Sequence, residues 1–169
     1  MEPVIVPGEP APDFGLTDLA GRRHRLSDQM GRVTVLHIWS ALCPWTERTD
    51  AAVLEAATSH GADLWSIASN ADEAQAVLMK ESQSRHLPVV LLDPDQRVAD
   101  LYGAVATPHV FVVDERGVVR YHGAVDDARF REPVPRRRFL AEALAAVRLG
   151  QDPEPGVTPT YGCAIVRAA

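Results

Sequence analysis

The stretch VTVLHIWSALCPWTE, residues 33–47, joins two different local patterns. Its first seven residues form a nearly continuous apolar run rich in β-branched side chains, which is typical of a strand covered on both faces. After Cys43 the period becomes helical, and Gly61 ends it. The apolar residues that share one helical face are Val53, Leu54 and Ala57. Pro44 suits the first helical position, where no amide hydrogen is needed, so the stretch predicts a central strand that leads through Cys43 into a helix.

The alternation of strand and helix continues toward the C-terminus. DLWSIAS (63–69) and PVVLL (88–92) predict two further strands, separated by a charged amphipathic helix over residues 71–86. We expect the buried edge of that helix to contain Ala76, Val77, and Met79 or Lys80. A short helix follows Pro94 and ends at Gly103. Strands connected by helices in this way form parallel β-α-β units.

A different connection follows in the next part of the chain. HVFVVD (109–114) and VVRYHG (118–123) are joined through a short segment that contains glycine, which predicts an antiparallel hairpin. Residues 136–149 predict the last helix. Its apolar residues at helical spacing are Phe139, Leu140, Leu144 and Val147.

The two ends of the chain complete the layout. Residues 14–28 predict a leading hairpin, whereas residues 151–169 are rich in proline and glycine and predict an extended tail. The residues of the hairpin expected to point inward are Leu16 and Leu26. The order of elements predicts an α/β protein with a central mixed β-sheet flanked by helices, a layout similar to that of thioredoxin-like proteins. We divide the chain into one domain, residues 1–150, and a tail, residues 151–169, which carries Cys163 and packs on the domain.

The composition disfavours several classes of function. A formal net charge of −6 and a pI near 5.5 oppose binding to nucleic acid, because an acidic protein is repelled by phosphates. The basic run at 136–138 is the local exception, and we expect it to be a solvated helix start. The N-terminal stretch is acidic and broken by proline, unlike a secretory leader, and no segment approaches the ~20 apolar residues of a membrane helix. We therefore expect a soluble cytoplasmic protein with neither a nucleic-acid nor a membrane partner.

Cys43 is the strongest candidate for chemistry. It falls at the carboxyl end of a central strand, where open α/β sheets place their sites. The helix that follows has N-terminal amide groups and a partial positive charge that favour a thiolate. An inert buried cysteine is the alternative, since free cysteine is among the most buried residue types. His109 and Cys163 could join Cys43 as soft metal ligands, but no C-x-x-C or H-x-x-H pair supports this, so we expect neither a metal nor an organic cofactor.

Four segments that cover most of the chain resemble the thioredoxin-like superfamily. They are GEPAPDFGLTDLAGR, VTVLHIWSALCPW, LYGAVATPHVFVVDERGVVRYHG and TPTYGCAIVR. The first three are shared by many thioredoxin-like families. The last resembles a narrower peroxiredoxin-like branch (redoxin, or alkyl hydroperoxide reductase/thiol-specific antioxidant), in which a glycine-cysteine pair near the C-terminus accompanies a cysteine-proline-aromatic element.

The resemblance implies roles for particular residues. It implies that Cys43 is the attacking thiol, that Pro108 is preceded by a cis peptide bond, and that Thr107 faces the sulfur. It also makes Cys163 a partner thiol in the tail.

The chain departs from the family pattern at two places. Thr46 stands where a C-x-x-C protein has its second cysteine, so a vicinal dithiol cycle is excluded. Leu36 and Ser40 stand where a typical peroxiredoxin has proline and threonine. The Ser40 hydroxyl could still contact a peroxide. Arg120 is either a cationic partner of the thiolate or an ordinary exposed strand arginine.

Two further side chains are candidates for contact with a substrate or partner. Trp45 either presents a contact surface beside the thiol or caps the start of the helix against the tail. His109, directly after Pro108, is better placed than His37 to approach Cys43. We expect His37 to be a hydrogen-bonded core histidine.

The two cysteines together predict redox chemistry. An attacking thiolate that forms a sulfenic acid or a mixed disulfide needs a second thiol to resolve it, and Cys163 could reach the site in the same chain or in a homodimer. Alternatively, CAIVR pairs as an edge strand and Cys163 is only packed. We expect a thiol-disulfide oxidoreductase of antioxidant type, reduced by thioredoxin or a low-molecular-weight thiol. The alternatives are a peroxidase that reduces hydroperoxides and a non-catalytic redoxin-fold binding module with a structural disulfide.

Overall fold

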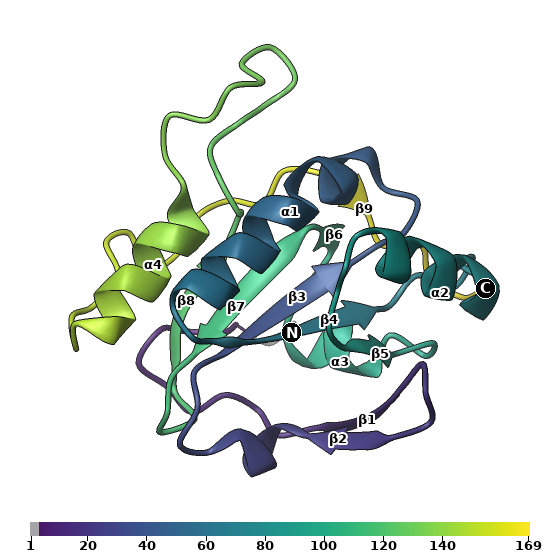
Figure 1. Ribbon diagram of the computed structural model, residues 1–169, viewed down its shortest axis with the longest axis horizontal. Helices are drawn as coiled ribbons and strands as arrows, with labels where there is room; N and C mark the ends of the chain where they lie inside the picture. Colours follow the sequence, from purple (N-terminus) through teal and green to yellow (C-terminus); the bar gives the residue numbers. More distant parts are fainter. Residues whose placement is uncertain (1–3) are drawn as a thin grey trace.

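The computed structural model describes residues 4–169 and contains a mixed sheet of seven strands with helices on both faces (Figure 1). The strands of this sheet are β1 Gly15–Asp18, β2 Arg23–Arg25, β3 Thr34–Trp39, β4 Asp63–Ala68, β5 Val90–Leu92, β7 His109–Val113 and β8 Val119–Gly123. The α-helices are α1 Pro44–Ser59, α2 Gln75–Ser84, α3 Arg97–Leu101 and α4 Phe139–Arg148, and a 3-10 helix, η1, spans Leu26–Gln29. Across the sheet the strands follow the order β2-β1-β5-β4-β3-β7-β8. The predicted α/β class with a mixed sheet is confirmed.

β3 is an interior strand of the sheet, as the continuous apolar run predicts. β3 pairs in parallel with β4 and antiparallel with β7, and all six of its residues are buried. β4 and β5 continue the parallel part, and β7 with β8 forms the predicted antiparallel hairpin. The leading hairpin is also present, because β1 pairs antiparallel with β2 and then with β5.

Successive residues of the central strands enter two separate hydrophobic cores. Val35 and Trp39 pack on the face covered by α1, α2 and α4. Leu36 and Ile38 pack on the opposite face, with α3 and the leading hairpin. This alternation follows from the period of two residues in a strand. Both faces of β3 are therefore covered, and only its ends are available for a site.

The predicted helix over residues 71–86 is wrong at its start and in its buried edge. α2 begins only at Gln75, because residues 71–74 form a turn whose Glu73 carboxylate binds the loop after β3. The helix buries a narrow stripe of Leu78 and Ser82, spaced by four residues. The residues expected at the buried edge are exposed or only half-buried: Ala76, Val77, Met79 and Lys80.

The last helix also begins later than the sequence predicts. The Asp127 carboxylate accepts hydrogen bonds from the backbone amides of Arg136 and Arg137, at 2.8 and 3.0 Å, and this holds both arginines outside the helix. α4 therefore starts at Phe139. Of its four predicted apolar contacts, Leu140 and Leu144 are buried, and Phe139 and Val147 are partly buried against the same core.

The tail runs back over the body of the molecule instead of leaving it (yellow in Figure 1). Its two-residue strand β9, Cys163–Ala164, pairs antiparallel with β6, Ala106–Thr107. The next residue, Ile165, is buried in the core on the α3 side of the sheet. The edge pairing considered for CAIVR thus exists over its first two residues, and it places the tail beside the start of α1.

Candidate functional site

A disulfide joins Cys43 to Cys163 across 120 residues of sequence, with 6.2 Å between their Cα atoms. Cys43 is the N-cap residue of α1 and is only 3% exposed, whereas Cys163 is half-buried on β9. The chain has no other cysteine. The pairing therefore uses every thiol, and it links the central strand-helix unit to the tail.

The backbone around Thr107 brings the two cysteines together. Thr107 is the direct partner of Cys163 in the β6-β9 pairing, and its carbonyl oxygen lies 3.6 Å from the Cys43 Sγ atom. The Thr107–Pro108 peptide bond is cis. Gly162 passes so close to Thr107 that an added Cβ would overlap the Thr107 carbonyl oxygen. Glycine at this position is therefore what allows the tail to reach the sulfur.

A hydrogen-bond network ties the loop before Cys43 to the tail after Cys163. The Ser40 hydroxyl and the Leu42 backbone amide both donate to the Glu73 Oε1 atom, each at 2.8 Å. The Asn70 side-chain amide donates to Glu73 Oε2 at 3.2 Å, and the Asn70 oxygen accepts from the Val166 backbone amide at 2.7 Å. Ser40, which the sequence analysis considers a candidate contact for peroxide, therefore already donates its hydroxyl proton to Glu73.

Thr46 stabilises the loop between β3 and α1. Its side chain is fully buried, and its hydroxyl lies 2.8 Å from the carbonyl oxygen of Cys43 and also contacts that of Ser40. A hydroxyl has one proton, so it donates to one of these oxygens at a time. The side chain at the position of a second C-x-x-C cysteine thus holds the backbone on both sides of Cys43.

Trp45 packs against the tail and is partly buried. Its ring meets the ring of Tyr161 edge-on at 4.8 Å, and the Arg48 guanidinium lies 5.3 Å from its centre. Tyr161 is two residues before Cys163. The sequence leaves two roles open for Trp45, a surface for a partner and a contact with the tail. The structure shows the contact with the tail.

His109 lies in β7 and is engaged with His122 on β8. The His122 Nε2 atom faces the Ile5 carbonyl oxygen at 2.9 Å and must carry the proton, so His109 Nε2 donates to His122 Nδ1 at 3.1 Å. Burial and the neighbouring His122 lower the pKa of His109 to about 3, so it is neutral at physiological pH. His109 stacks on Phe111, in the core opposite α1, and no hydrogen bond joins it to Cys43 or Cys163 within residues 4–169.

A buried polar cluster underlies α1, and of its members the sequence identified only His37, as a hydrogen-bonded core histidine. Asp50 of α1 accepts hydrogen bonds from the Trp39 indole and from Arg85, both at 2.9 Å. His37 is fully buried, bonds to Ser66 at 3.2 Å, and has its Nε2 atom 3.8 Å from Asp50 Oδ1. Burial lowers the pKa of His37 to about 4, although the Asp50 charge acts in the opposite direction. An aspartate within the inward face of a helix is the only local signal for this cluster.

Arg120 lies away from the thiol. It forms ion pairs with Asp114 at 3.1 Å and with Asp152 at 2.7 Å. Burial acts to lower the pKa of Arg120, but the hydrogen bonds and charges of these two carboxylates together raise it. The arginine thus anchors the beginning of the tail to the end of the sheet away from Cys43.

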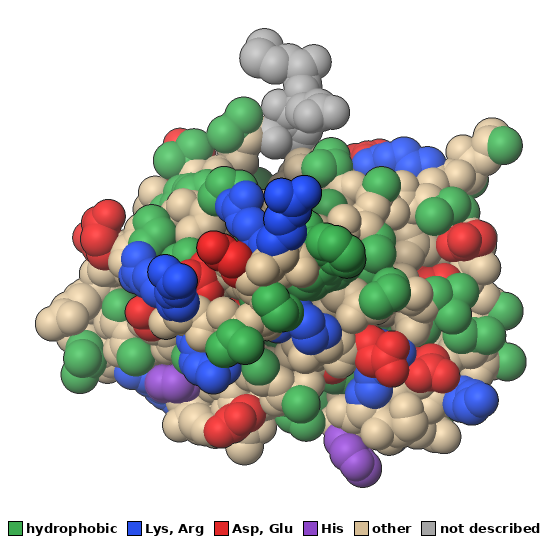
Figure 2. Space-filling model, turned by 90° about the horizontal axis from the view of Figure 1, so that it is seen from above, with side chains coloured by type: hydrophobic (Ala, Val, Ile, Leu, Met, Phe, Trp, Pro, Cys, Tyr) green, Lys and Arg blue, Asp and Glu red, His purple; other side chains and the backbone are tan. Residues whose placement is uncertain are grey.

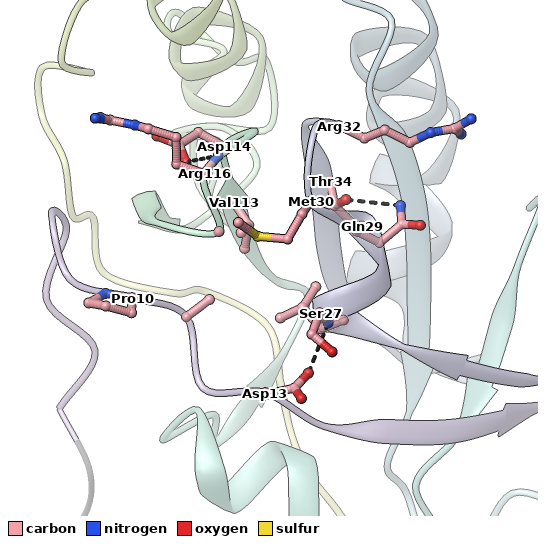
Figure 3. Close-up of a pocket in the computed structure, with 13 residues that line it drawn as sticks. Pro10, Asp13, Ser27, Gln29, Met30, Arg32, Thr34, Val113, Asp114 and Arg116 are labelled. Carbon is pink, nitrogen blue, oxygen red and sulfur yellow. Dashed lines mark hydrogen bonds between the residues drawn. The ribbon is translucent and has the colours of Figure 1, made fainter.

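A pocket of about 220 Å³ lies at the other end of β3 (Figure 3). It is bounded by η1, the N-terminal segment and the turn between β7 and β8. Its polar groups already bind one another: Ser27 to Asp13 at 2.9 Å, Gln29 to Thr34 at 3.1 Å and Arg116 to Asp114 at 2.9 Å. Thr34 begins β3, whereas Cys43 follows its carboxyl end, so this pocket is separate from the disulfide.

Among residues 4–169, no three His, Cys, Asp or Glu side chains converge in an arrangement suited to a metal ion. In the same part of the chain, no helix combines the length and the apolarity needed to cross a membrane.

The chain is similar in sequence to known proteins over most of its length. The AhpC/TSA family matches residues 7–122. Thiol-disulfide oxidoreductase ResA from Geobacillus kaustophilus is 30% identical over 120 residues, which cover 69% of this chain and 68% of ResA. Thiol:disulfide interchange protein DsbE from Allochromatium vinosum is 26% identical over 130 residues, 75% of this chain and 72% of DsbE.

Solved structures are similar over different shares of this chain, and one of them covers nearly all of it. A conserved protein from Geobacillus kaustophilus superposes with a TM-score of 0.88 at 25% identity, covering 97% of this chain and 93% of that one. The thioredoxin domain of a thiol-disulfide oxidoreductase from Bacteroides vulgatus has a TM-score of 0.61 at 22% identity and covers 68% of this chain and 86% of its own. The thioredoxin-like fold predicted from the sequence is confirmed.

Proposed function

This chain belongs to the AhpC/TSA family, and we propose that it is a thiol-disulfide oxidoreductase in which Cys43 attacks and Cys163 resolves. The observation that carries the proposal is the Cys43–Cys163 disulfide at the start of α1. The relatives named for thiol-disulfide exchange support the same chemistry.

The reaction cycle balances with the two sulfurs alone. In the reduced protein, the Cys43 thiolate attacks one sulfur of a substrate disulfide, forms a mixed disulfide, and releases the other substrate sulfur as a thiolate. The Cys163 thiolate then attacks the Cys43 sulfur and releases the second substrate thiolate. The substrate gains two electrons and the protein is left with the Cys43–Cys163 disulfide. No bound organic cofactor takes part.

The start of α1 promotes the first step. The amide groups of its first turn and the helix dipole stabilise negative charge on the sulfur at the N-cap. The Thr107 carbonyl oxygen, 3.6 Å from Sγ, can accept a hydrogen bond only from the protonated thiol. The helix therefore supports the thiolate for attack, and the carbonyl supports the thiol when Cys43 is at rest.

Reduction of the disulfide closes the cycle. In the cytoplasm, the location expected from the sequence, thioredoxin or a low-molecular-weight thiol would supply the two electrons. Because the disulfide lies within one chain, this cycle requires no second subunit.

Reaction of the reduced protein with 5,5′-dithiobis(2-nitrobenzoate) tests these roles. The wild-type protein should release two equivalents of coloured thiolate, one from attack by Cys43 and one from resolution by Cys163. Cys163→Ser should release one equivalent and retain a stable adduct on Cys43, detectable by mass spectrometry. Cys43→Ser should release its one equivalent from Cys163 and form no internal disulfide. An unreactive Cys43 in the reduced, folded protein would overturn the proposal.

Peroxidase activity is the second candidate, and the AhpC/TSA match is the observation that favours it. The engagement of Ser40 with Glu73 is against it, because the hydroxyl proton is already donated. Stopped-flow oxidation of the reduced protein by hydrogen peroxide separates the two: a rate no greater than that of free cysteine would exclude the peroxidase. The third alternative is a binding module whose disulfide is only structural, and it predicts that Cys163→Ser lowers stability and leaves any turnover by Cys43 unchanged.

A further inference from the structure

The loop between β8 and α4 projects from the body of the molecule at the end where β9 and the start of α1 lie (Figure 1). Two large apolar side chains on it are almost fully in solvent: Phe130 is 81% exposed and Val134 is 78% exposed. Covering exposed apolar side chains of this size with a partner lowers the free energy, because it removes apolar surface from water. We call residues 127–138 the projecting loop.

The charge of the projecting loop is opposite to that of the whole protein. Its sequence, DARFREPVPRRR, has five arginines against one aspartate and one glutamate, a net charge of +3 in a chain of net charge −6. Arg137 is paired with Glu142 at 3.3 Å. Within residues 4–169, four arginines of the loop form no ion pair: Arg129, Arg131, Arg136 and Arg138. Figure 2, which views the molecule from this end, shows Lys and Arg side chains standing among hydrophobic ones.

The base of the projecting loop is held in place. Asp126 accepts hydrogen bonds from Arg48 at 2.7 Å and from the Ala128 amide at 3.0 Å. Asp127 accepts from the amides of Arg136 and Arg137, which closes the two arms of the loop. The apolar and cationic side chains are therefore presented on a preorganised support, which lowers the entropic cost of binding.

The projecting loop contacts the segment that carries the resolving cysteine. The Phe130 backbone amide donates to the Tyr161 hydroxyl at 3.2 Å, and the Arg129 guanidinium lies 5.7 Å from the centre of the Tyr161 ring. Tyr161 in turn packs on Trp45, two residues after Cys43. A continuous surface thus leads from the tip of the loop to the disulfide.

We propose that the projecting loop docks an acidic protein segment with apolar side chains, supplied by the protein whose thiol or disulfide reacts at Cys43. This inference rests on the proposed exchange activity. The arginines provide attraction for carboxylates, and Phe130 and Val134 provide apolar contacts that a free small thiol or a nucleic acid would not use. The net charge of the whole protein is −6, so long-range electrostatics alone would favour a basic substrate. A preference for acidic substrates would therefore come from the loop.

Cysteine peptides activated as mixed disulfides with 5-thio-2-nitrobenzoate are the probe. Attack by the Cys43 thiolate on the peptide sulfur forms the Cys43-peptide disulfide and expels the coloured thiolate, so one absorbance measurement follows every peptide. We compare acidic, neutral and basic peptides of equal length. The acidic peptide should react about tenfold faster than the basic one at low ionic strength, and the ratio should approach one near 1 M salt, where screening acts over ~3 Å.

Matched variants assign the preference to the loop. Arg131→Glu combined with Arg136→Glu should remove or invert the acidic preference. Arg22→Glu combined with Arg116→Glu is the control, because it makes the same charge change on exposed arginines outside the loop. This variant should still react faster with the acidic peptide than with the basic one. Phe130→Ser should abolish the rate advantage of an acidic peptide containing leucine over one containing serine.

The outcomes distinguish failure of the docking proposal from failure of the proposed exchange activity at Cys43. Equal rates for all three peptides, or equal effects of the two double variants, would overturn the docking proposal and leave exchange at Cys43 intact. Failure of every peptide to release thiolate would overturn both. Binding of a short DNA duplex that competes with the acidic peptide and is lost in the loop variant would also overturn it, in favour of a nucleic-acid surface.

Discussion

The two sulfurs of the disulfide sit on very different supports. Cys43 follows β3, which is paired on both sides, and it caps α1, a helix of 16 residues. Cys163 lies on a strand of two residues, paired only with another strand of two residues. The Cys43 sulfur is therefore held by the core of the sheet and by α1, whereas the Cys163 sulfur is held by one short pair of strands.

The segment around β9 is also anchored by contacts on both sides of Cys163. Tyr161 packs on Trp45 before Cys163, and Ile165 enters the core after it. Farther back, the Thr158 hydroxyl bonds to the Ala124 amide at 2.9 Å and to the Tyr121 hydroxyl at 2.6 Å. These contacts do not depend on the disulfide, so the reduced tail should stay close enough for Cys163 to resolve a mixed disulfide on Cys43.

The largest expected effect is the loss of stability when the Cys43–Cys163 disulfide is reduced. Closing a loop of 120 residues restricts the unfolded chain, so reductant should lower the unfolding free energy of the wild-type protein by about 4–5 kcal/mol. Denaturant unfolding with and without dithiothreitol measures this. Cys163→Ala should already be at the lower value and should not respond to reductant. A wild-type protein equally stable in both conditions would show that the tail contacts, and not the disulfide, dominate.

Acidification should lower the stability of the protein through His37 of β3. Because the pKa of His37 is about 4 in the folded protein and near 6.5 when unfolded, the unfolded state binds more protons between these values. The unfolding free energy should fall as the pH drops from about 6.5 to 4, by about 3 kcal/mol from this histidine. His37→Gln should reduce the slope, measured by unfolding at each pH. The part that remains is assigned to other groups whose pKa is lowered by burial, such as His109 and His122. Parallel profiles for variant and wild type would contradict the assignment to His37.

A smaller effect should come from separating the tail from β6 without touching either sulfur. In Gly162→Ala the new methyl group would overlap the Thr107 carbonyl oxygen and lie 3.1 Å from the Pro108 ring. We expect a loss of about 1–3 kcal/mol from this overpacking, and a disulfide that is easier to reduce. Equilibration with glutathione buffers measures the reducibility. Thr160→Ala, in the same segment, is the control, and equal behaviour of the two variants would contradict a close approach at Gly162.

Much of the fold was readable because its signals are local. The apolar run of β3, the change of period after Cys43 and the glycine turn between β7 and β8 each depend on neighbouring residues. The starts of α2 and α4 were not readable, because each is set by a side chain that binds a distant or non-helical backbone. Glu73 binds the loop after β3, and Asp127 binds the amides before α4.

The candidate site divides in the same way. The position of Cys43 before a helix follows from sequence, and the resemblance to redoxins singled out Thr107, Pro108 and Cys163. The network through Glu73 and the burial of His109 against His122 have no local signature. Both depend on which segments the sheet and the tail bring together.

The sequence by itself determined the order of strands and helices and the placement of one cysteine at a helix N-terminus, because periodicity and capping act over a few residues. Only the tertiary structure decided that Cys163 reaches Cys43, that the tail lies along β6, and that an arginine-rich loop stands beside the disulfide. Contacts across more than a hundred residues depend on packing and backbone pairing in the assembled chain, and no short segment encodes them.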